Sequence, residues 1–162
     1  MKTKINIAVV DDEELFRTGI VFLLERESDF NVAFQADNGQ DLITKLSVIS
    51  EKPDIILMDL KMPELNGVET TKIVHKKFPE CKVIALTSYD GKAFITNMID
   101  VGASSYLLKN TNPKTVVHTI REGHEKGFFY DESSFKLYLE QHLNMSSIEL
   151  EVQTPPPEYT MC

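Results

Sequence analysis

Five short apolar runs recur along the chain, and the segments between them carry apolar residues at helical spacing. Runs of this length are typical of β-strands, whereas the longer periodic segments indicate helices. A chain that alternates strand and helix in this way folds through right-handed βαβ crossovers into a parallel sheet with helices on both faces. The predicted strands are Ile5–Val10, Asn31–Phe34, Asp54–Met58, Val83–Leu86 and Ser105–Leu108.

Local signals mark several ends of the intervening helices. Asn112 is an N-cap residue, and Pro113 follows it at the first helical position. Phe78-Pro79 ends a helix predicted from Gly67 to Lys77, and Gly102 is placed to cap the next helix. Helical spacing is seen for Phe16, Ile20, Leu23 and Leu24, for Leu42, Ile43 and Leu46, for Phe94, Ile95, Met98 and Ile99, and for Val116, Val117 and Ile120.

The apolar continuity of the runs predicts their order in the sheet. The first, third and fourth runs are the most continuous, which is typical of strands buried on both faces. The second and fifth runs are weaker and suit the edges. We therefore predict a flavodoxin-like, doubly wound α/β fold whose five-stranded parallel sheet has the order 2-1-3-4-5.

Length and charge limit what such a chain does. The 162 residues give room for one domain and a short appendage. A net charge of -8 disfavours binding of the chain itself to nucleic acid or to an anionic membrane. Cys81 and Cys162 are too few for a disulfide framework, and no apolar stretch suits a signal peptide or a membrane span. We expect a soluble cytoplasmic protein.

The character of the sequence changes after Gly127. We expect residues 1–127 to form the α/β domain and residues 128–144 to form a C-terminal extension helix that acts as a linker. Residues 145–162 combine serines, scattered acids and Pro155-Pro156-Pro157, so we expect this tail to be disordered.

Polar residues follow four of the five predicted strands. The first run ends in Asp11-Asp12, the third in Asp59, the fourth in Thr87-Ser88 and the fifth in Lys109. Ligands of open parallel sheets bind outside the carboxyl ends of the strands. We therefore expect three carboxylates, a hydroxyl and an ammonium to meet at one edge.

Clustered carboxylates of this kind favour a bound cation, and Mg²⁺ prefers oxygen ligands while also binding phosphate oxygens. Asp59 ends the most central run and is the best candidate for a nucleophile in aspartyl-phosphate chemistry. Lys109 and the Thr87 hydroxyl are suited to stabilise the oxygens of a transferring phosphoryl group. The simpler interpretation, that acids at strand ends merely cap helices, fits Asp11 and Asp12 alone about as well.

Four motifs together resemble the receiver domains of response regulators, over about residues 4 to 125. The most specific is the D-x-x-M-P-x-x-x-G stretch from Asp59 to Gly67. The style of the sequence is most similar to receivers that precede a LuxR-type (NarL-type) DNA-binding domain. The other motifs are Val9-Val10-Asp11-Asp12, Ala85-Leu86-Thr87-Ser88 and Tyr106-Leu107-Leu108-Lys109.

The resemblance implies a role for each matching residue. Asp59 is the phosphoacceptor, and Thr87 and Lys109 contact the phosphoryl oxygens. Tyr106 is an aromatic switch that turns inward when Thr87 moves. The implied Mg²⁺ ligands are Asp12, Asp59 and the backbone carbonyl of Lys61, with Asp11 acting through water. One departure is visible, because Asn110 stands where many receivers have proline after the lysine.

The function implied is that of a two-component receiver. A sensor histidine kinase donates the phosphoryl group, and phosphorylation shifts a two-state equilibrium that controls transcription, with a homodimer as the candidate active form. The residues after Gly127 contain no recognition helix or basic patch, so DNA contact implies a domain outside this chain. Such a receiver catalyses its own phosphorylation and dephosphorylation but is not a turnover enzyme.

Three alternatives remain open from the sequence. One is a stand-alone or phosphate-independent receiver that acts through protein–protein interaction. A haloacid-dehalogenase-type phosphatase also uses an aspartyl nucleophile, but Lys61 stands where it needs an acid. A flavodoxin-like cofactor carrier needs a phosphate-binding loop after the first strand, and acids are found there instead.

Overall fold

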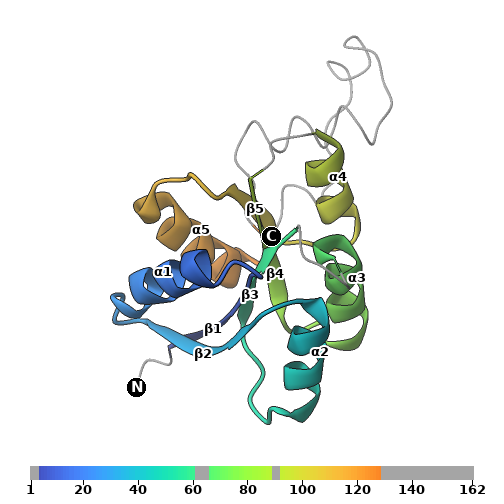
Figure 1. Cartoon of the computed structure of the whole chain (residues 1–162), viewed down its shortest axis with the longest axis horizontal. Coiled ribbons are helices and arrows are strands. Elements are labelled where there is room, and N and C mark those ends of the chain that lie inside the picture. The colour runs from blue at the N-terminus through green and yellow to red at the C-terminus, as the bar shows by residue number, and fades with distance from the viewer. Residues whose placement is uncertain (1–3, 61–65, 89–91, 129–162) are drawn as a thin grey trace.

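The computed structural model describes residues 4–60, 66–88 and 92–128. Strands and helices alternate strictly along this part of the chain (Figure 1). The strands are β1 (Ile5–Val10), β2 (Phe30–Ala36), β3 (Ile55–Asp59), β4 (Lys82–Thr87) and β5 (Ser105–Leu108). The helices are α1 (Glu14–Glu25), α2 (Gly39–Val48), α3 (Gly67–Lys77), α4 (Lys92–Asp100) and α5 (Pro113–Lys126).

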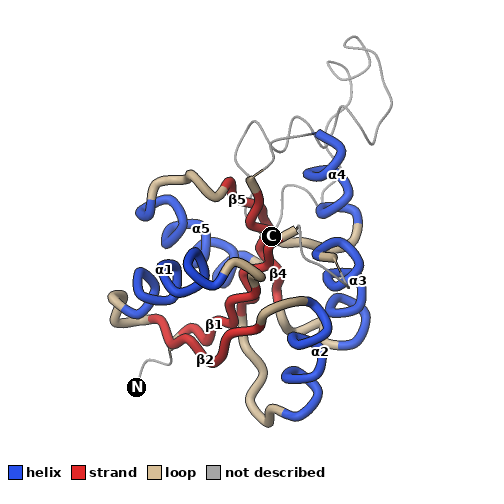
Figure 2. The backbone as a smooth tube through the Cα atoms, viewed as in Figure 1, coloured by secondary structure: helices blue, strands red, loops and turns tan. Residues whose placement is uncertain are grey.

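All strands pair in parallel in one sheet of order β2-β1-β3-β4-β5, which confirms the predicted topology. The β1–β2 register shifts by one residue after Ile7, and β2 is longer than predicted at both ends. Figure 2 shows the strands as a central layer with helices on either side. The two edge strands are the least buried, as the weaker apolar runs indicated.

Two cores lie on opposite faces of the sheet, because alternate residues of each central strand point to opposite sides. Helices α1 and α5 cover one face, and α2, α3 and α4 cover the other (Figure 1). The core under α1 and α5 includes Ile7, Val9, Leu24, Leu57, Ile84 and Ile120. The opposite core includes Ala8, Val10, Leu46, Met58, Val83, Ala85 and Met98. Each continuous apolar run in the sequence therefore contributes its residues alternately to the two cores.

Several helix ends follow the predicted local chemistry. The Asn112 side chain accepts a hydrogen bond from the Lys114 backbone N–H, and Pro113 begins α5. Gly102 adopts a φ of 105°, a left-handed conformation that glycine reaches without strain. On α5, Arg121 donates hydrogen bonds to both carboxylate oxygens of Asp29 and thereby fastens α5 to the α1–β2 connection.

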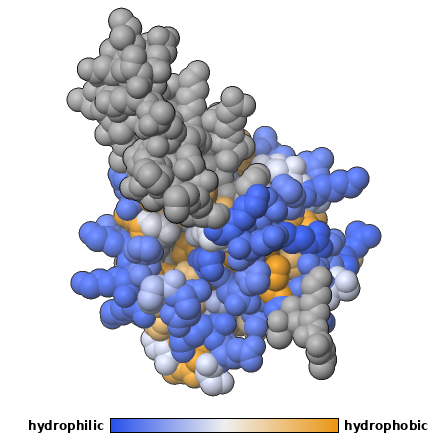
Figure 3. Space-filling view, turned by 180° about the vertical axis from the view of Figure 1, so that it is seen from behind, coloured by the Kyte–Doolittle hydropathy of each residue, from blue (hydrophilic) through white to orange (hydrophobic). Residues whose placement is uncertain are grey.

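The outer surface is mostly polar. Figure 3 shows hydrophilic residues over most of the face drawn there, with smaller apolar areas between them. None of the helices in the described ranges is both long and apolar enough to cross a bilayer. Lys61, the predicted disordered tail and all but the first residue of the predicted linker helix (128–144) lie outside the described residues.

Gly67 lets α3 begin directly against the end of β3. A Cβ at this position would lie 2.5 Å from the Asp59 carbonyl oxygen and 2.7 Å from the Leu60 Cα. Both are backbone atoms, which cannot move aside as a flexible side chain can. The Gly67 N–H also donates to the Leu60 carbonyl at 3.1 Å. The glycine of the D-x-x-M-P-x-x-x-G stretch therefore has a packing role beside Asp59.

We expect Gly67→Ala to lower the free energy of unfolding by about 1–3 kcal/mol, because the added methyl overpacks a fixed backbone contact. Urea unfolding followed by circular dichroism measures this change. Gly19→Ala is the matched control, since a Cβ there meets nothing within 4 Å. In the interior of α1 it should stabilise the helix by roughly 0.5–1 kcal/mol. Equal effects of the two substitutions would contradict the packing role.

Candidate functional site

Residues from four strand ends meet at the carboxyl edge of the sheet. Asp11 follows β1, Asp59 ends β3, Thr87 ends β4 and Lys109 follows β5. The hydrogen bonding between β4 and β5 continues to this point, because the Lys109 N–H donates to the Thr87 carbonyl at 2.8 Å. Asp11, Asp59 and Thr87 are all buried, with 1–3% of their surface exposed. The predicted clustering of these positions is therefore present.

Lys109 is the cation at the centre of this group. Its Nζ lies 3.0 Å from Asp11 Oδ2, 3.5 Å from Asp59 Oδ1 and 2.5 Å from Glu13 Oε1. The same ammonium lies 4.6 Å from the centre of the Phe16 ring, within the range of a cation–π contact. Lys109 thus contacts three carboxylates and an aromatic face at once.

The surroundings of Lys109 favour its charged, protonated form. Burial of the ammonium lowers its pKa, but the hydrogen bond to Glu13, the close contact with Asp11 and the charge of Asp59 outweigh burial, and the pKa of Lys109 is raised. Lys109 is therefore cationic at neutral pH. A lysine in this state neutralises negative charge and donates hydrogen bonds, and it does not act as a base.

Asp11 is fixed by its backbone and by one carboxylate oxygen. Its Oδ1 accepts a hydrogen bond from the Glu13 N–H at 2.8 Å, and its carbonyl accepts one from Arg17 at 2.6 Å. The other oxygen, Oδ2, is buried and makes no hydrogen bond of good geometry among the described residues, although Lys109 is near. A buried carboxylate oxygen left in this way is suited to a cation.

The carboxylates that converge most closely in the described part of the chain are Asp11, Glu13 and Asp59. One oxygen from each lies within 4.8 Å of the others, which is close enough for a shared metal ion. This oxygen-only set matches the ligands that Mg²⁺ prefers, so the residues fit that ion.

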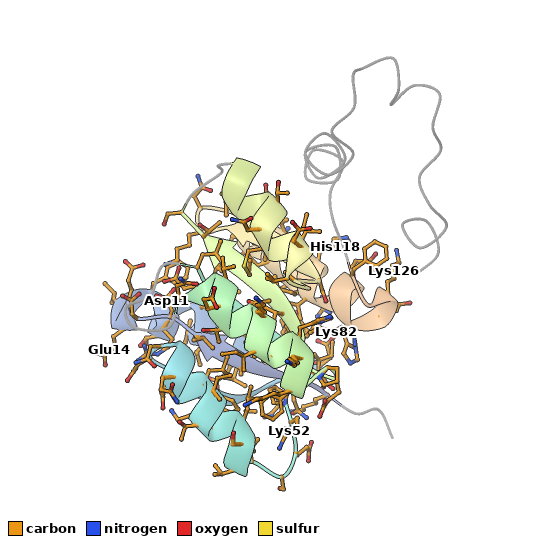
Figure 4. The ribbon with its side chains drawn as sticks, turned by 90° about the vertical axis from the view of Figure 1, so that its right-hand side faces the viewer. Asp11, Glu14, Lys52, Lys82, His118 and Lys126 are labelled. Atoms are coloured by element: carbon orange, nitrogen blue, oxygen red, sulfur yellow. The ribbon has the colours of Figure 1, made fainter. Side chains whose placement is uncertain are left out.

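The positions of the acids after β1 differ in part from the expectation. Asp12 is exposed and does not belong to this group, and its role as a metal ligand stays a prediction. Glu13 does belong to it, although no sequence motif singled it out. Its position three residues beyond the end of the central strand β1 was the available signal. Figure 4 shows Asp11 and Glu14 together at one end of the molecule, with Lys82 and Lys126 toward the other.

The two predicted switch residues lie on the other side of the sheet from Lys109. Thr87 follows Ala85 by two positions on β4, so by alternation it faces the side covered by α3 and α4. Tyr106 pairs with Ala85 across β4 and β5 and is half-buried against the core on that same side. The structure therefore brings Thr87 and Tyr106 to neighbouring strands and a shared face.

Comparison with known proteins gives a consistent result. A family model described as the response regulator receiver domain matches residues 7–121. The transcriptional regulatory protein DegU of Brevibacillus brevis is 33% identical over 120 residues, which are 74% of this chain and 50% of DegU. The response regulator protein VraR of Staphylococcus saprophyticus is 40% identical over 118 residues, 73% of this chain and 56% of VraR. The chain thus spans about half the length of these curated relatives.

Solved structures agree in fold. The signal receiver domain of NarL from Mycobacterium tuberculosis superposes with a TM-score of 0.71 at 26% identity, covering 76% of this chain and 98% of that one. A LuxR-family two-component response regulator from Aurantimonas sp. SI85-9A1 superposes with a TM-score of 0.76 at 25% identity, covering 87% and 99%. Each superposition covers almost the whole of the solved structure's chain.

We expect Lys109→Met to lower the free energy of unfolding by roughly 3 kcal/mol in metal-free buffer, because it leaves buried carboxylates uncompensated. Lys126→Met is the matched control, since Lys126 pairs with Glu122 one turn away on the surface of α5. That exposed pair should contribute far less. Urea unfolding of both variants measures the difference, and similar losses would show that Lys109 is not compensating buried charge.

The wild type and Lys109→Met should also differ in how their stability depends on pH. The folded-state pKa of Lys109 is raised, so its contribution to stability is complete at neutral pH. That contribution is lost as the pH rises through the raised value. The stability difference between the wild type and Lys109→Met should therefore be constant around neutrality and shrink only in strongly alkaline buffer.

Proposed function

Because this chain belongs to the response regulator receiver domain family, we propose that it accepts a phosphoryl group on Asp59 from a sensor histidine kinase and acts as a conformational switch. The observation that carries this proposal is the contact set of Lys109. An ammonium fixed beside two buried aspartates, one of them at the end of the central strand β3, is an arrangement suited to aspartyl phosphorylation.

The chemistry assigned to Asp59 is an in-line transfer. One carboxylate oxygen of Asp59 attacks phosphorus and forms the new O–P bond. The bond from phosphorus to the donor breaks, and its electron pair leaves with the donor group, a histidine nitrogen in the kinase. Lys109 donates hydrogen bonds to the oxygens of the transferring group, and the Thr87 hydroxyl donates to another of them. In hydrolysis, a water oxygen attacks the same phosphorus, the bond from phosphorus to the Asp59 oxygen breaks, and inorganic phosphate leaves while the Asp59 carboxylate is restored.

Mg²⁺ is the cofactor that this site would take. Asp59, the exposed Asp12 and the Lys61 backbone carbonyl would ligate it directly, and Asp11 would act through water. When bound, Mg²⁺ neutralises charge on the phosphoryl oxygens and so lets an anionic donor approach a carboxylate. The buried Oδ2 of Asp11 supports this assignment, because a carboxylate oxygen in that state is stabilised by a cation.

The switch would act through Thr87 and Tyr106. When the Thr87 hydroxyl turns toward the phosphoryl group, it vacates space on the face of the sheet under α3 and α4. Tyr106 is half-buried on the same face, on the neighbouring strand, and would turn inward to fill that space. Phosphorylation would in this way shift the population of two arrangements of the α4–β5 surface.

The output we propose is control of transcription. The relatives DegU and VraR carry the names of a transcriptional regulatory protein and a response regulator, and each is about twice as long as the matched region. DNA would be contacted by a domain beyond the matched region, with the receiver governing activity through a homodimer that forms on phosphorylation. The protein would work in the cytoplasm and would turn over no substrate other than its own phosphoryl group.

Incubation with acetyl phosphate and Mg²⁺ should give one phosphoryl adduct per chain by intact-mass spectrometry. We expect the adduct to be absent when Mg²⁺ is replaced by EDTA and absent from Asp59→Asn. Asp54→Asn is the matched control, because Asp54 immediately precedes β3 at its opposite end. An adduct that persists in Asp59→Asn would rule out Asp59 as the acceptor.

Mg²⁺ should also raise the melting temperature of the wild type, since a ligand that binds only the folded state stabilises it by about 2.7 kcal/mol at a hundred times its dissociation constant. Asp11→Asn should lose most of this rise, whereas Asp54→Asn should keep it. Differential scanning fluorimetry over a Mg²⁺ titration measures the shift. An unchanged response in Asp11→Asn would remove Asp11 from the proposed metal site.

A further inference from the structure

Glu13 makes the shortest of the three carboxylate contacts of Lys109. Its Oε1 lies 2.5 Å from Nζ, compared with 3.0 Å for Asp11 and 3.5 Å for Asp59. Under the proposed function, Lys109 must donate its hydrogen bonds to the phosphoryl oxygens. In this structure, Lys109 donates a hydrogen bond to the carboxylate of Glu13, in the β1–α1 loop, instead.

The position of Glu13 is built into the fold. Its backbone N–H is held by Asp11 Oδ1 at 2.8 Å, and its carbonyl accepts the Arg17 N–H that opens α1. Glu13 is the N-cap residue of α1, yet its side chain makes no capping hydrogen bond. A side chain that caps is worth about 1 kcal/mol to a helix. At this N-cap, the carboxylate is directed to Lys109 rather than to its own helix.

Only one of the three carboxylates is free to leave. The side chains of Asp11 and Asp59 are 1% and 5% exposed, whereas that of Glu13 is 62% exposed. An arriving phosphoryl group is itself an anion and needs the hydrogen bonds of the ammonium. Because Asp11 and Asp59 are enclosed, Glu13 is the group that gives up its contact and turns into solvent.

We propose that Glu13 is a built-in competitor for Lys109. It holds the ammonium while Asp59 is unphosphorylated and thereby slows the acquisition of phosphoryl groups from anionic donors. This inference rests on the proposed function. It assigns to Glu13 a positioning and rate-setting role at the same site, through a carboxylate that mimics the phosphoryl group in its contact with Lys109.

Glu13→Gln tests this role, with Glu14→Gln as the matched control. Both substitutions remove one negative charge from neighbouring exposed residues, but of the two only Glu13 contacts Lys109 in the described structure. The measurement is the rate of adduct formation with acetyl phosphate at saturating Mg²⁺ and low salt. We expect Glu13→Gln to react about two- to fivefold faster than Glu14→Gln, the range that the loss of a partly exposed ion pair allows. Added KCl should shrink this ratio, because salt screens the exposed carboxylate.

The outcomes separate the inference from the proposed function. A wild type that forms the adduct, together with equal rates for Glu13→Gln and Glu14→Gln, would overturn the competitor role and leave the receiver chemistry standing. The competitor role is also overturned if the faster rate of Glu13→Gln is independent of salt, since competition for an ammonium is electrostatic. A wild type that forms no adduct would instead overturn the proposed phosphorylation of Asp59, and the role of Glu13 with it.

Discussion

Two carboxylates buried at the carboxyl edge of the sheet need compensating charge, and the Lys109 ammonium lies between them. Asp11 and Asp59 are held there by strands whose other residues fill the cores. Neither can move to solvent without disrupting β1 or β3, so the fold concentrates negative charge where water is largely excluded. Such an arrangement is stable only with a cation near it. Lys109 supplies one positive charge, and Asp11 Oδ2, which is paired with that charge but makes no hydrogen bond of good geometry among the described residues, is suited to a second cation.

The backbone around this charge is correspondingly rigid. Arg17 donates to the Asp11 carbonyl and also to the Gln35 side chain, so it fastens the β1–α1 loop to β2. On the other side of Asp59, Gly67 lets α3 start in direct contact with the end of β3. The aspartates are thus fixed by their chain neighbours. The residues free to respond to an incoming group are those with an exposed end, as Glu13 has, or with a half-buried one, as Tyr106 has.

Much of this follows from the sequence, for physical reasons. Strand positions and order were predictable, because burial on both faces demands continuous apolar runs in β1, β3 and β4. Clustering of Asp11, Asp59, Thr87 and Lys109 was predictable, because parallel strands all end at one edge. The orientations of Asp12 and Glu13 were not. After Val10 the chain leaves the sheet, and the alternation that assigns a side chain to a face ends with it. Which acid turns toward Lys109 depends on the turn that Asp11 Oδ1 closes.

The separation of the two cores also restricts where a signal from the site can travel. Lys109 lies beyond Leu107, whose side chain belongs to the core under α1 and α5, and its ammonium contacts the Phe16 ring on that side. Thr87 and Tyr106 belong by alternation and packing to the opposite face, under α3 and α4. A group bonded to Asp59 that contacts both Lys109 and Thr87 would therefore act on both faces at once.

On the Lys109 side, the exposed Glu13 can respond by giving up its contact with Lys109 and turning into solvent. On the Thr87 side the response must come from packed residues, and Tyr106 is the half-buried one on the edge strand. The asymmetry in burial thus makes the α4–β5 surface the part of the domain best suited to report what happens at Asp59.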